Sequence, residues 1–248
     1  GIKRLSDWNV ALAFVLLFFI VLMGPTLFIV ELGFEAVGHM LQNFLRMSTW
    51  ADAAKTSSFV ESWTVFYWAW WLALGPYMGM FICKISRGRT LRQMILGCIG
   101  YGTLGSVVFF AILGNYALYL ELNGIYPVLE TMNSAGPPSA IVGVLTTLPW
   151  PKLVLLLFTI VCLIFAATSY DSSSYTLAAA ATDELPPTAH PARWHRVFWA
   201  IAIAILPIGL MYAGGVREAQ TATLVVSLPL TFTFWLSGIA LLKSLRAD

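Results

Sequence analysis

Charged residues are scarce in this sequence of 248 residues. Asp, Glu, Lys and Arg together make up 10% of the chain, whereas a soluble domain carries about a quarter. Hydrophobic residues make up 59%, and the mean hydropathy is +0.80. A chain so poor in charge and so rich in apolar residues is predicted to be an integral membrane protein.

Residues that bind metals or form disulfides are also few. Cys83, Cys98 and Cys162 lie in or beside apolar runs without a CxxC spacing, so neither a disulfide framework nor a zinc site is predicted. The three histidines are scattered outside the apolar cores. No nucleophile motif or phosphate loop is present in a suitable place, which makes a lipid-modifying enzyme the weakest hypothesis. We therefore expect that the protein is not an enzyme and uses no cofactor. The net charge of +2 does not point to nucleic acid as a partner.

Six stretches are apolar and long enough to span a bilayer, which takes about 20 residues. They cover approximately residues 8–33, 62–83, 94–121, 150–182, 197–213 and 221–242. Gly24-Pro25 predicts a kink in the first span, and glycines in the third would let neighbouring helices approach closely. The fold class predicted is an all-α polytopic membrane protein.

The stretch of residues 34–62 is too polar to span. Apolar and polar residues alternate in it at helical spacing, and it contains Glu35, His39, Arg46, Asp52 and Lys55. We predict an amphipathic helix on the surface of the lipid bilayer, followed by a short connection.

Lys and Arg in the loops predict the orientation. Ten basic residues fall on the side of both chain ends and four on the other side, which accounts for all 14. The first side is therefore expected to be cytoplasmic. The basic loop of residues 84–92 acts mainly as a topology determinant, and its Arg87 and Arg89 are also candidates for pairing with a carboxylate at a cytoplasmic gate.

An aromatic run occupies the second span, where residues 63–71 read WTVFYWAWW. At about 100° per residue, Tyr67 and Trp71 share a helix face. Trp68 also lies beside Trp71, while Trp70 points to the side. A wall of rings binds cations that carry no N–H, because the ring quadrupole attracts positive charge. The alternative is an aromatic belt at the level of the lipid headgroups.

A run of hydroxyl groups occupies the fourth span, where residues 165–176 read FAATSYDSSSYT. Polar groups at this depth are costly unless they face protein, water or an ion. A helix that loosens here would offer carbonyl oxygens to Na⁺ beside the hydroxyls of Thr168 and Ser169. The alternative is that these hydroxyls bond only to their own or a neighbouring helix. For Asp171, a proton carrier, a partner of a buried arginine and an interfacial carboxylate all remain open.

Three motifs together resemble the signature of the betaine/carnitine/choline transporter (BCCT) family. They are WTVFYWAWW, ISRGRT at residues 85–90 and ATSYDS at residues 167–172. The family has twelve spans in two inverted five-helix repeats, and by comparison this chain holds spans seven to twelve. Residues 1–62 would then hold the last helix of the first repeat and a surface helix, and residues 63–248 the second repeat with a cytoplasmic tail. Because the chain opens at Gly1 without Met, we expect it to begin within a longer polypeptide.

The resemblance also implies a substrate site near the midplane of the membrane. Family substrates are zwitterionic or cationic quaternary ammonium compounds held in a box of aromatic rings. By position, Trp71 belongs to this box, Trp70 and Trp68 lie along the pathway, and Tyr67 shares the face of Trp71. Leu74 stands where several members carry another tryptophan, so the substrate preference is open.

The resemblance further implies two sites for Na⁺ as the coupling ion. One would use Thr168 and Ser169 with Phe165 one turn earlier, and the other would use Tyr77 after the Gly-Pro break. Proton-coupled members also carry the Thr-Ser pair, and residues 174–178 are reminiscent of carnitine exchangers that need no ion.

These implications predict a secondary transporter with alternating access. It would import glycine betaine, choline, carnitine or a sulfonium analogue by Na⁺ symport, as a homotrimer in the inner (plasma) membrane with both ends of this chain cytoplasmic. Within the family, the alternatives are a proton-coupled symporter and an ion-independent exchanger. Outside it, the alternative is a non-transporting membrane sensor or structural subunit.

Overall fold

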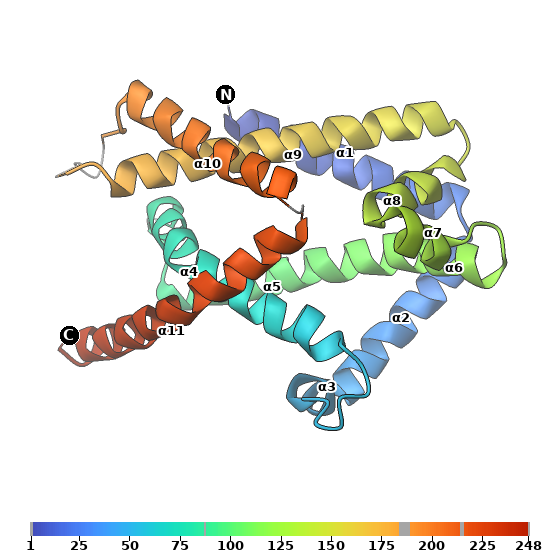
Figure 1. Cartoon of the computed structure of the whole chain (residues 1–248), viewed down its shortest axis with the longest axis horizontal. Helices are drawn as coiled ribbons and strands as arrows, with labels where there is room; N and C mark the ends of the chain where they lie inside the picture. The colour runs from blue at the N-terminus through green and yellow to red at the C-terminus, as the bar shows by residue number, and fades with distance from the viewer. Residues whose placement is uncertain (1, 87, 184–188, 214–215, 248) are drawn as a thin grey trace. The chain divides into compact units, whose positions relative to one another are not determined.

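The computed structural model describes residues 2–86, 88–183, 189–213 and 216–247, and every regular element within these ranges is a helix (Figure 1). This confirms the all-α class. The helices up to the end of the aromatic span are α1 (Ile2–Met23), α2 (Thr26–Gln42), α3 (Phe44–Thr49), the π-helix η1 (Val60–Val65) and α4 (Phe66–Ile85). The others are α5 (Leu91–Phe109), the π-helix η2 (Phe110–Gly114), α6 (Asn115–Leu122), α7 (Val128–Ala135), α8 (Pro137–Thr146), α9 (Pro151–Ala180), α10 (Arg193–Ala213) and α11 (Val216–Ala247).

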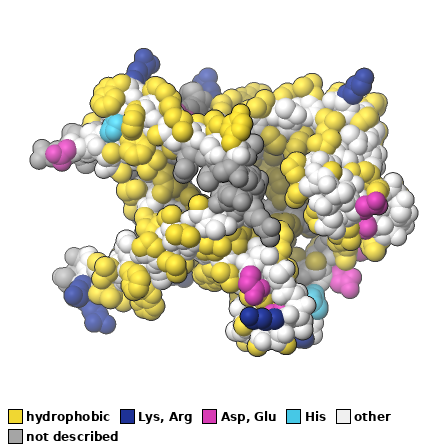
Figure 2. Space-filling view, in the orientation of Figure 1, with side chains coloured by type: hydrophobic (Ala, Val, Ile, Leu, Met, Phe, Trp, Pro, Cys, Tyr) yellow, Lys and Arg dark blue, Asp and Glu magenta, His cyan; other side chains and the backbone are white. Residues whose placement is uncertain are grey.

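Five helical segments are long and apolar enough to cross a membrane. They are Lys3–Met23, Val60–Cys83, Leu91–Leu122, Pro151–Ala180 and Gln220–Ser244, and they match five of the six predicted spans. The sixth prediction, at residues 197–213, falls on α10, a helix of 21 residues. Hydrophobic side chains are spread over much of the visible surface, and charged side chains are few (Figure 2).

Gly24-Pro25 separates two helices, so the predicted kink in a span reaching residue 33 was wrong. Pro25 has no N–H to continue α1, and the hydroxyl of Thr26 donates to the carbonyl of Val21 at 2.6 Å. This bond satisfies a carbonyl that the end of α1 would otherwise leave unpaired. The helix that carries the start of the predicted amphipathic segment therefore begins at Thr26 rather than at residue 34, and α2 exposes the apolar side chains of Leu27 and Phe34.

The contacts between residues group the chain into two compact units. This grouping concerns packing, whereas the predicted division at residue 62 concerns internal repeats and stays a prediction. Unit one comprises residues 1–49 and 89–169, and unit two comprises residues 50–88 and 170–248. Helix α9 is continuous, and its residues up to Ser169 belong to unit one and those from Tyr170 to unit two.

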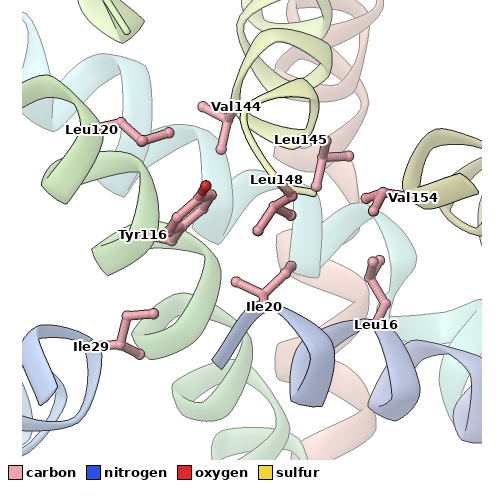
Figure 3. Packing of buried hydrophobic residues seen from close by; sticks show 9 residues of the cluster. All are labelled: Leu16, Ile20, Ile29, Tyr116, Leu120, Val144, Leu145, Leu148 and Val154. Carbon is pink, nitrogen blue, oxygen red and sulfur yellow. The ribbon is translucent and has the colours of Figure 1, made fainter. Parts of the chain in front are cut away.

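The core of unit one lies where α1, α2, α6, α8 and α9 meet (Figure 3). Ile20, Leu145 and Val154 are almost fully buried there. Tyr116 adds a hydrogen bond from its hydroxyl group to that of Thr147, at 2.7 Å. This core explains why the connection between the third and fourth spans contains the apolar helix α8, whose Val144 and Leu145 are buried in it.

The glycines of the third span have no neighbours in the described part of the chain. A Cβ atom placed at any of them would have nothing within 4 Å outside its own helix: Gly97, Gly100, Gly102, Gly105 and Gly114. No neighbouring helix therefore occupies the space left by these missing side chains in the described part of the chain, although η2, which contains Gly114, contacts α1 and α2.

Unit two is built around the crossing of α4 and α11. At this crossing Gly75 leaves room for an aromatic ring, because a Cβ atom at residue 75 would overlap the ring of Phe234. Helix α10 also packs against α11. The crossing fixes which face of α4 is covered and which faces are free to carry the aromatic run.

Candidate aromatic and ion-binding site

Four rings of the aromatic run form one contiguous set on η1 and α4. Trp63 stacks on Tyr67 with ring centroids 6.0 Å apart, and Phe66 stacks on Trp70 at 5.7 Å. Tyr67 also contacts Trp70 at 5.8 Å. Sequence reasoning missed Trp63 and Phe66 as members of this set. The i, i+3, i+4, i+7 spacing of the four rings is the signal that identifies them.

Trp68 and Trp71 lie outside this stacked set. Their side chains are 70% and 63% exposed, whereas Ala69 between them is buried at 6%. The face of α4 that packs at this level is therefore the one that carries Ala69. The indoles of Trp68 and Trp71 lie on open faces. An exposed indole face within reach of other rings is suited to a quaternary ammonium group, because the contact needs no hydrogen bond.

Helix α4 continues through Gly75-Pro76 and then presents Tyr77 to α9. Pro76 has no N–H to donate to the carbonyl of Leu72, so α4 lacks one helical hydrogen bond at this point. One residue later, the hydroxyl oxygen of Tyr77 lies 3.0 Å from the hydroxyl oxygen of Ser173. The structure thus brings Tyr77 into direct contact with the hydroxyl run of α9.

The hydroxyl run lies on an unbroken helix, so the loosening that would free carbonyl oxygens near Thr168 is not present in this structure. The hydroxyl of Thr168 lies 3.0 Å from the carbonyl oxygens of both Ile164 and Phe165, to which it donates. This use of the proton leaves lone pairs on the oxygen for a cation. Ser169 and the ring of Phe165 are exposed.

Asp171 pairs with an arginine, which is close to one of the three roles that the sequence left open. The guanidinium Nη2 of Arg196 on α10 donates to Oδ1 of Asp171 at 2.9 Å. The same guanidinium lies over the ring of Tyr175 at 5.4 Å. The hydroxyl of Tyr175 in turn lies 2.9 Å from Nδ1 of His190. Side chains of α9 and α10 are therefore joined around the loop between the two helices.

A second side-chain relay joins the same two helices. The indole N–H of Trp199 donates to Nε2 of His195 at 3.1 Å, so this nitrogen carries no proton. Thr182 uses its hydroxyl proton on the carbonyl of Ala178 at 2.6 Å, and its oxygen lies 3.2 Å from Nδ1 of His195. All donors and acceptors are matched when His195 is neutral and protonated at Nδ1.

The basic loop after α4 is described only in part. Arg87 lies outside the described residues. Arg89 is exposed, and within the described ranges it takes part in no ion pair. The predicted gate therefore stays a prediction.

A cavity of about 590 Å³ lies between α4, α9 and α11 in unit two. Gly75 and Pro76 line it from α4, Thr176 from α9, and Phe234 and Ser237 from α11. The cavity is therefore next to the Tyr77–Ser173 contact on both helices.

Comparison with known proteins gives one family and several named relatives. The family described as betaine/carnitine/choline family transporter matches residues 1–248. A glycine betaine transporter of Acinetobacter baylyi is 32% identical over 252 residues, which cover 100% of this chain and 37% of the relative. A high-affinity choline transport protein of Escherichia coli is 32% identical over 249 residues, with coverage of 100% and 37%.

A third relative is named for a different substrate. It is a carnitine transporter of Acinetobacter baumannii, 30% identical over 250 residues, which cover 100% of this chain and 45% of the relative. The chain spans less than half the length of these three relatives.

Proposed function

The chain belongs to the betaine/carnitine/choline transporter family, and we propose that it works as a secondary transporter that imports a quaternary ammonium compound by Na⁺ symport. The observation that carries this proposal is the family match over residues 1–248. The family is one of membrane transporters, not of enzymes. A homotrimer in the inner membrane with both ends of this chain cytoplasmic is part of the same proposal.

Glycine betaine, choline and carnitine are the substrates we propose, since the three relatives are named for them. Each carries a trimethylammonium group, which attracts the face of an aromatic ring. One such contact is worth about 2 kcal/mol when water is excluded. Micromolar affinity requires about 8 kcal/mol, so several rings must act together with a group that binds the other end of the substrate. Trp71, Trp70, Trp68 and Tyr67 are the rings we propose for this chain.

Na⁺ is proposed to bind beside the hydroxyls of Thr168 and Ser169, with Phe165 one turn earlier on the same helix. Hydroxyl and carbonyl oxygens suit a hard cation, and Ser169 is exposed on α9. A second ion site is proposed at the ring of Tyr77. Alternating access follows when ion and substrate stabilise one arrangement of the helices over the other.

The first test replaces a proposed substrate ring. Trp71→Leu should weaken binding of the substrate by about 30-fold or more, which corresponds to about 2 kcal/mol. Isothermal titration of the purified full-length protein with glycine betaine, choline and carnitine measures this. Trp235→Leu is the matched control, because Trp235 is 72% exposed on α11 and lies outside the aromatic run. Equal affinity in both variants would remove Trp71 from the site.

The second test removes the proposed ion ligands. In the double variant Thr168→Ala, Ser169→Ala, the Na⁺ concentration that gives half-maximal uptake should rise at least about tenfold, because each lost ligand to a cation is worth about 1 kcal/mol or more. Thr159→Ala is the control, since Thr159 lies on the same helix and its hydroxyl likewise donates to a carbonyl of that helix. A Na⁺ curve unchanged in the double variant would place coupling elsewhere.

A further inference from the structure

Tyr77 and Ser173 join the two helices that carry the proposed substrate and ion sites. Their hydroxyl oxygens are 3.0 Å apart, and both side chains are half-buried. Tyr77 follows Trp70 by seven residues on α4, which leaves the two side chains only about 20° apart around the helix. Ser173 follows Ser169 by four residues on α9, so these two are neighbours on the helix surface. The hydrogen bond thus connects the aromatic face of α4 with the hydroxyl face of α9.

Ser173 differs from three other Ser and Thr residues of the hydroxyl run. The hydroxyls of Thr168, Ser174 and Thr176 donate to carbonyls of α9 itself. These bonds are local to the helix and transmit nothing to another element. The hydroxyl of Ser173 instead bonds across to α4, so a shift of either helix changes it.

The surroundings of this bond allow such a shift. Next to Tyr77, the proline at residue 76 deprives the carbonyl of Leu72 of its helical partner, which is a common cause of bending. The cavity of about 590 Å³ lies on the same stretch of both helices, with Pro76 and Thr176 among its lining residues. Space beside a weakened point of α4 leaves room for this stretch of the helix to shift relative to α9.

We propose that the Tyr77–Ser173 hydrogen bond couples ion binding on α9 to substrate binding on α4, with Ser173 as the positioning residue. This inference rests on the proposed Na⁺ symport. An ion that fixes the hydroxyl face of α9 holds Ser173 in place, and Ser173 then fixes the α4 segment that follows Trp70 and Trp71. Coupling between two binding sites is reciprocal, so the substrate increases the affinity for Na⁺ by the same factor.

The experiment measures how much Na⁺ increases substrate affinity in the full-length protein. Titrations with glycine betaine, choline and carnitine at saturating and at zero Na⁺ give this ratio for the wild type, Tyr77→Phe, Ser173→Ala and the double variant. Each single variant removes one hydroxyl and keeps the helix. The ratio should fall by about 2- to 10-fold in each single variant, the range of one neutral hydrogen bond. The double variant should lose no more than a single one, because both changes break the same bond.

Two controls separate coupling from general damage. Tyr116→Phe removes a hydroxyl that also bonds to another hydroxyl group, that of Thr147 in unit one, and should leave the ratio unchanged. Ser173→Thr keeps a hydroxyl at residue 173 and should restore most of the ratio.

The outcomes distinguish failure of the proposed function from failure of the coupling through the Tyr77–Ser173 hydrogen bond, called the link below. If Na⁺ leaves the substrate affinity of the wild type unchanged, or none of the three compounds binds, the Na⁺ symport proposal is overturned and the link with it. If Na⁺ increases affinity in the wild type and equally in Tyr77→Phe and Ser173→Ala, only the link is overturned.

Discussion

Asp52 accepts four hydrogen bonds from the residues that follow it in the loop before η1. They come from the backbone N–H and the hydroxyl of Thr56, at 3.1 and 2.7 Å, and from the same two groups of Ser57, at 2.8 and 3.1 Å. The hydroxyl of Thr56 is the largest cause of the lowered pKa of Asp52. The rings of Trp50 and Phe59 stack across the same loop, which is therefore closed by both polar and aromatic contacts.

The loop should lose stability in acid. Because the pKa of Asp52 is lowered on folding from its ordinary value of 3.8, its contribution is complete above pH 3.8 and is lost as the pH falls through the lowered pKa. Thermal unfolding of the purified protein in detergent, followed from pH 7 to pH 3, measures this. The Asp52→Asn variant, which cannot be deprotonated, should unfold at a lower temperature at pH 7, and its difference from the wild type should shrink below pH 4. A constant difference would contradict the assignment.

Single residues of the site were only partly predictable. The tryptophans of the second span were identified as candidate site residues from the sequence alone, since packing does not require so many large rings in one helix. The stacking of the four rings was missed, although their i, i+3, i+4, i+7 spacing is present in the sequence. The face of α4 that packs could not be predicted, because it is covered by Phe234, which is distant from Gly75 in the sequence. The roles of Trp71, Thr168 and Ser169 stay predictions.

Among the helices, α4 is the element on which most of the account depends. It carries the aromatic run, the proline at residue 76 and the contact with α9, and it packs against α11. Its position depends on a missing side chain, because the ring of Phe234 occupies the space where Gly75 has no Cβ.

Gly75→Ala should lower the free energy of unfolding by about 1–3 kcal/mol, the usual cost of overpacking. Gly79→Ala on the same helix is the matched control, since nothing lies within 4 Å of a Cβ at residue 79. There alanine should be neutral or stabilise by up to about 1 kcal/mol through its higher helix propensity. Denaturation of both variants in detergent compares them, and equal effects would show that the crossing with α11 does not depend on Gly75.

Helices were easier to predict from the sequence than their ends. Apolar length identified five spans because a helix that crosses lipid must satisfy its backbone internally. The boundary at Gly24-Pro25 was missed because a Gly-Pro pair can bend a helix or end it. The hydroxyl bond from Thr26 to Val21, which favours ending it here, follows from three-dimensional geometry. Helix α8 was missed because its burial depends on α1, α6 and α9.

At the scale of the whole molecule, the described helices keep most of their apolar surface open. In each of the five apolar segments, at most 17% of the most apolar window is buried. Side chains such as those of Phe18, Phe110 and Phe232 are 65%, 74% and 73% exposed. Such surface must meet lipid or other apolar protein surface, which agrees with the family of membrane transporters to which the chain belongs.

The most direct test of the account is uptake of radiolabelled glycine betaine, choline and carnitine into proteoliposomes that contain the full-length protein, with and without an inward Na⁺ gradient. We expect uptake of at least one of the three compounds, and we expect it to require the gradient. Exchange that is independent of the gradient would contradict Na⁺ symport and favour an exchanger. Absence of uptake for all three would contradict the transport function itself.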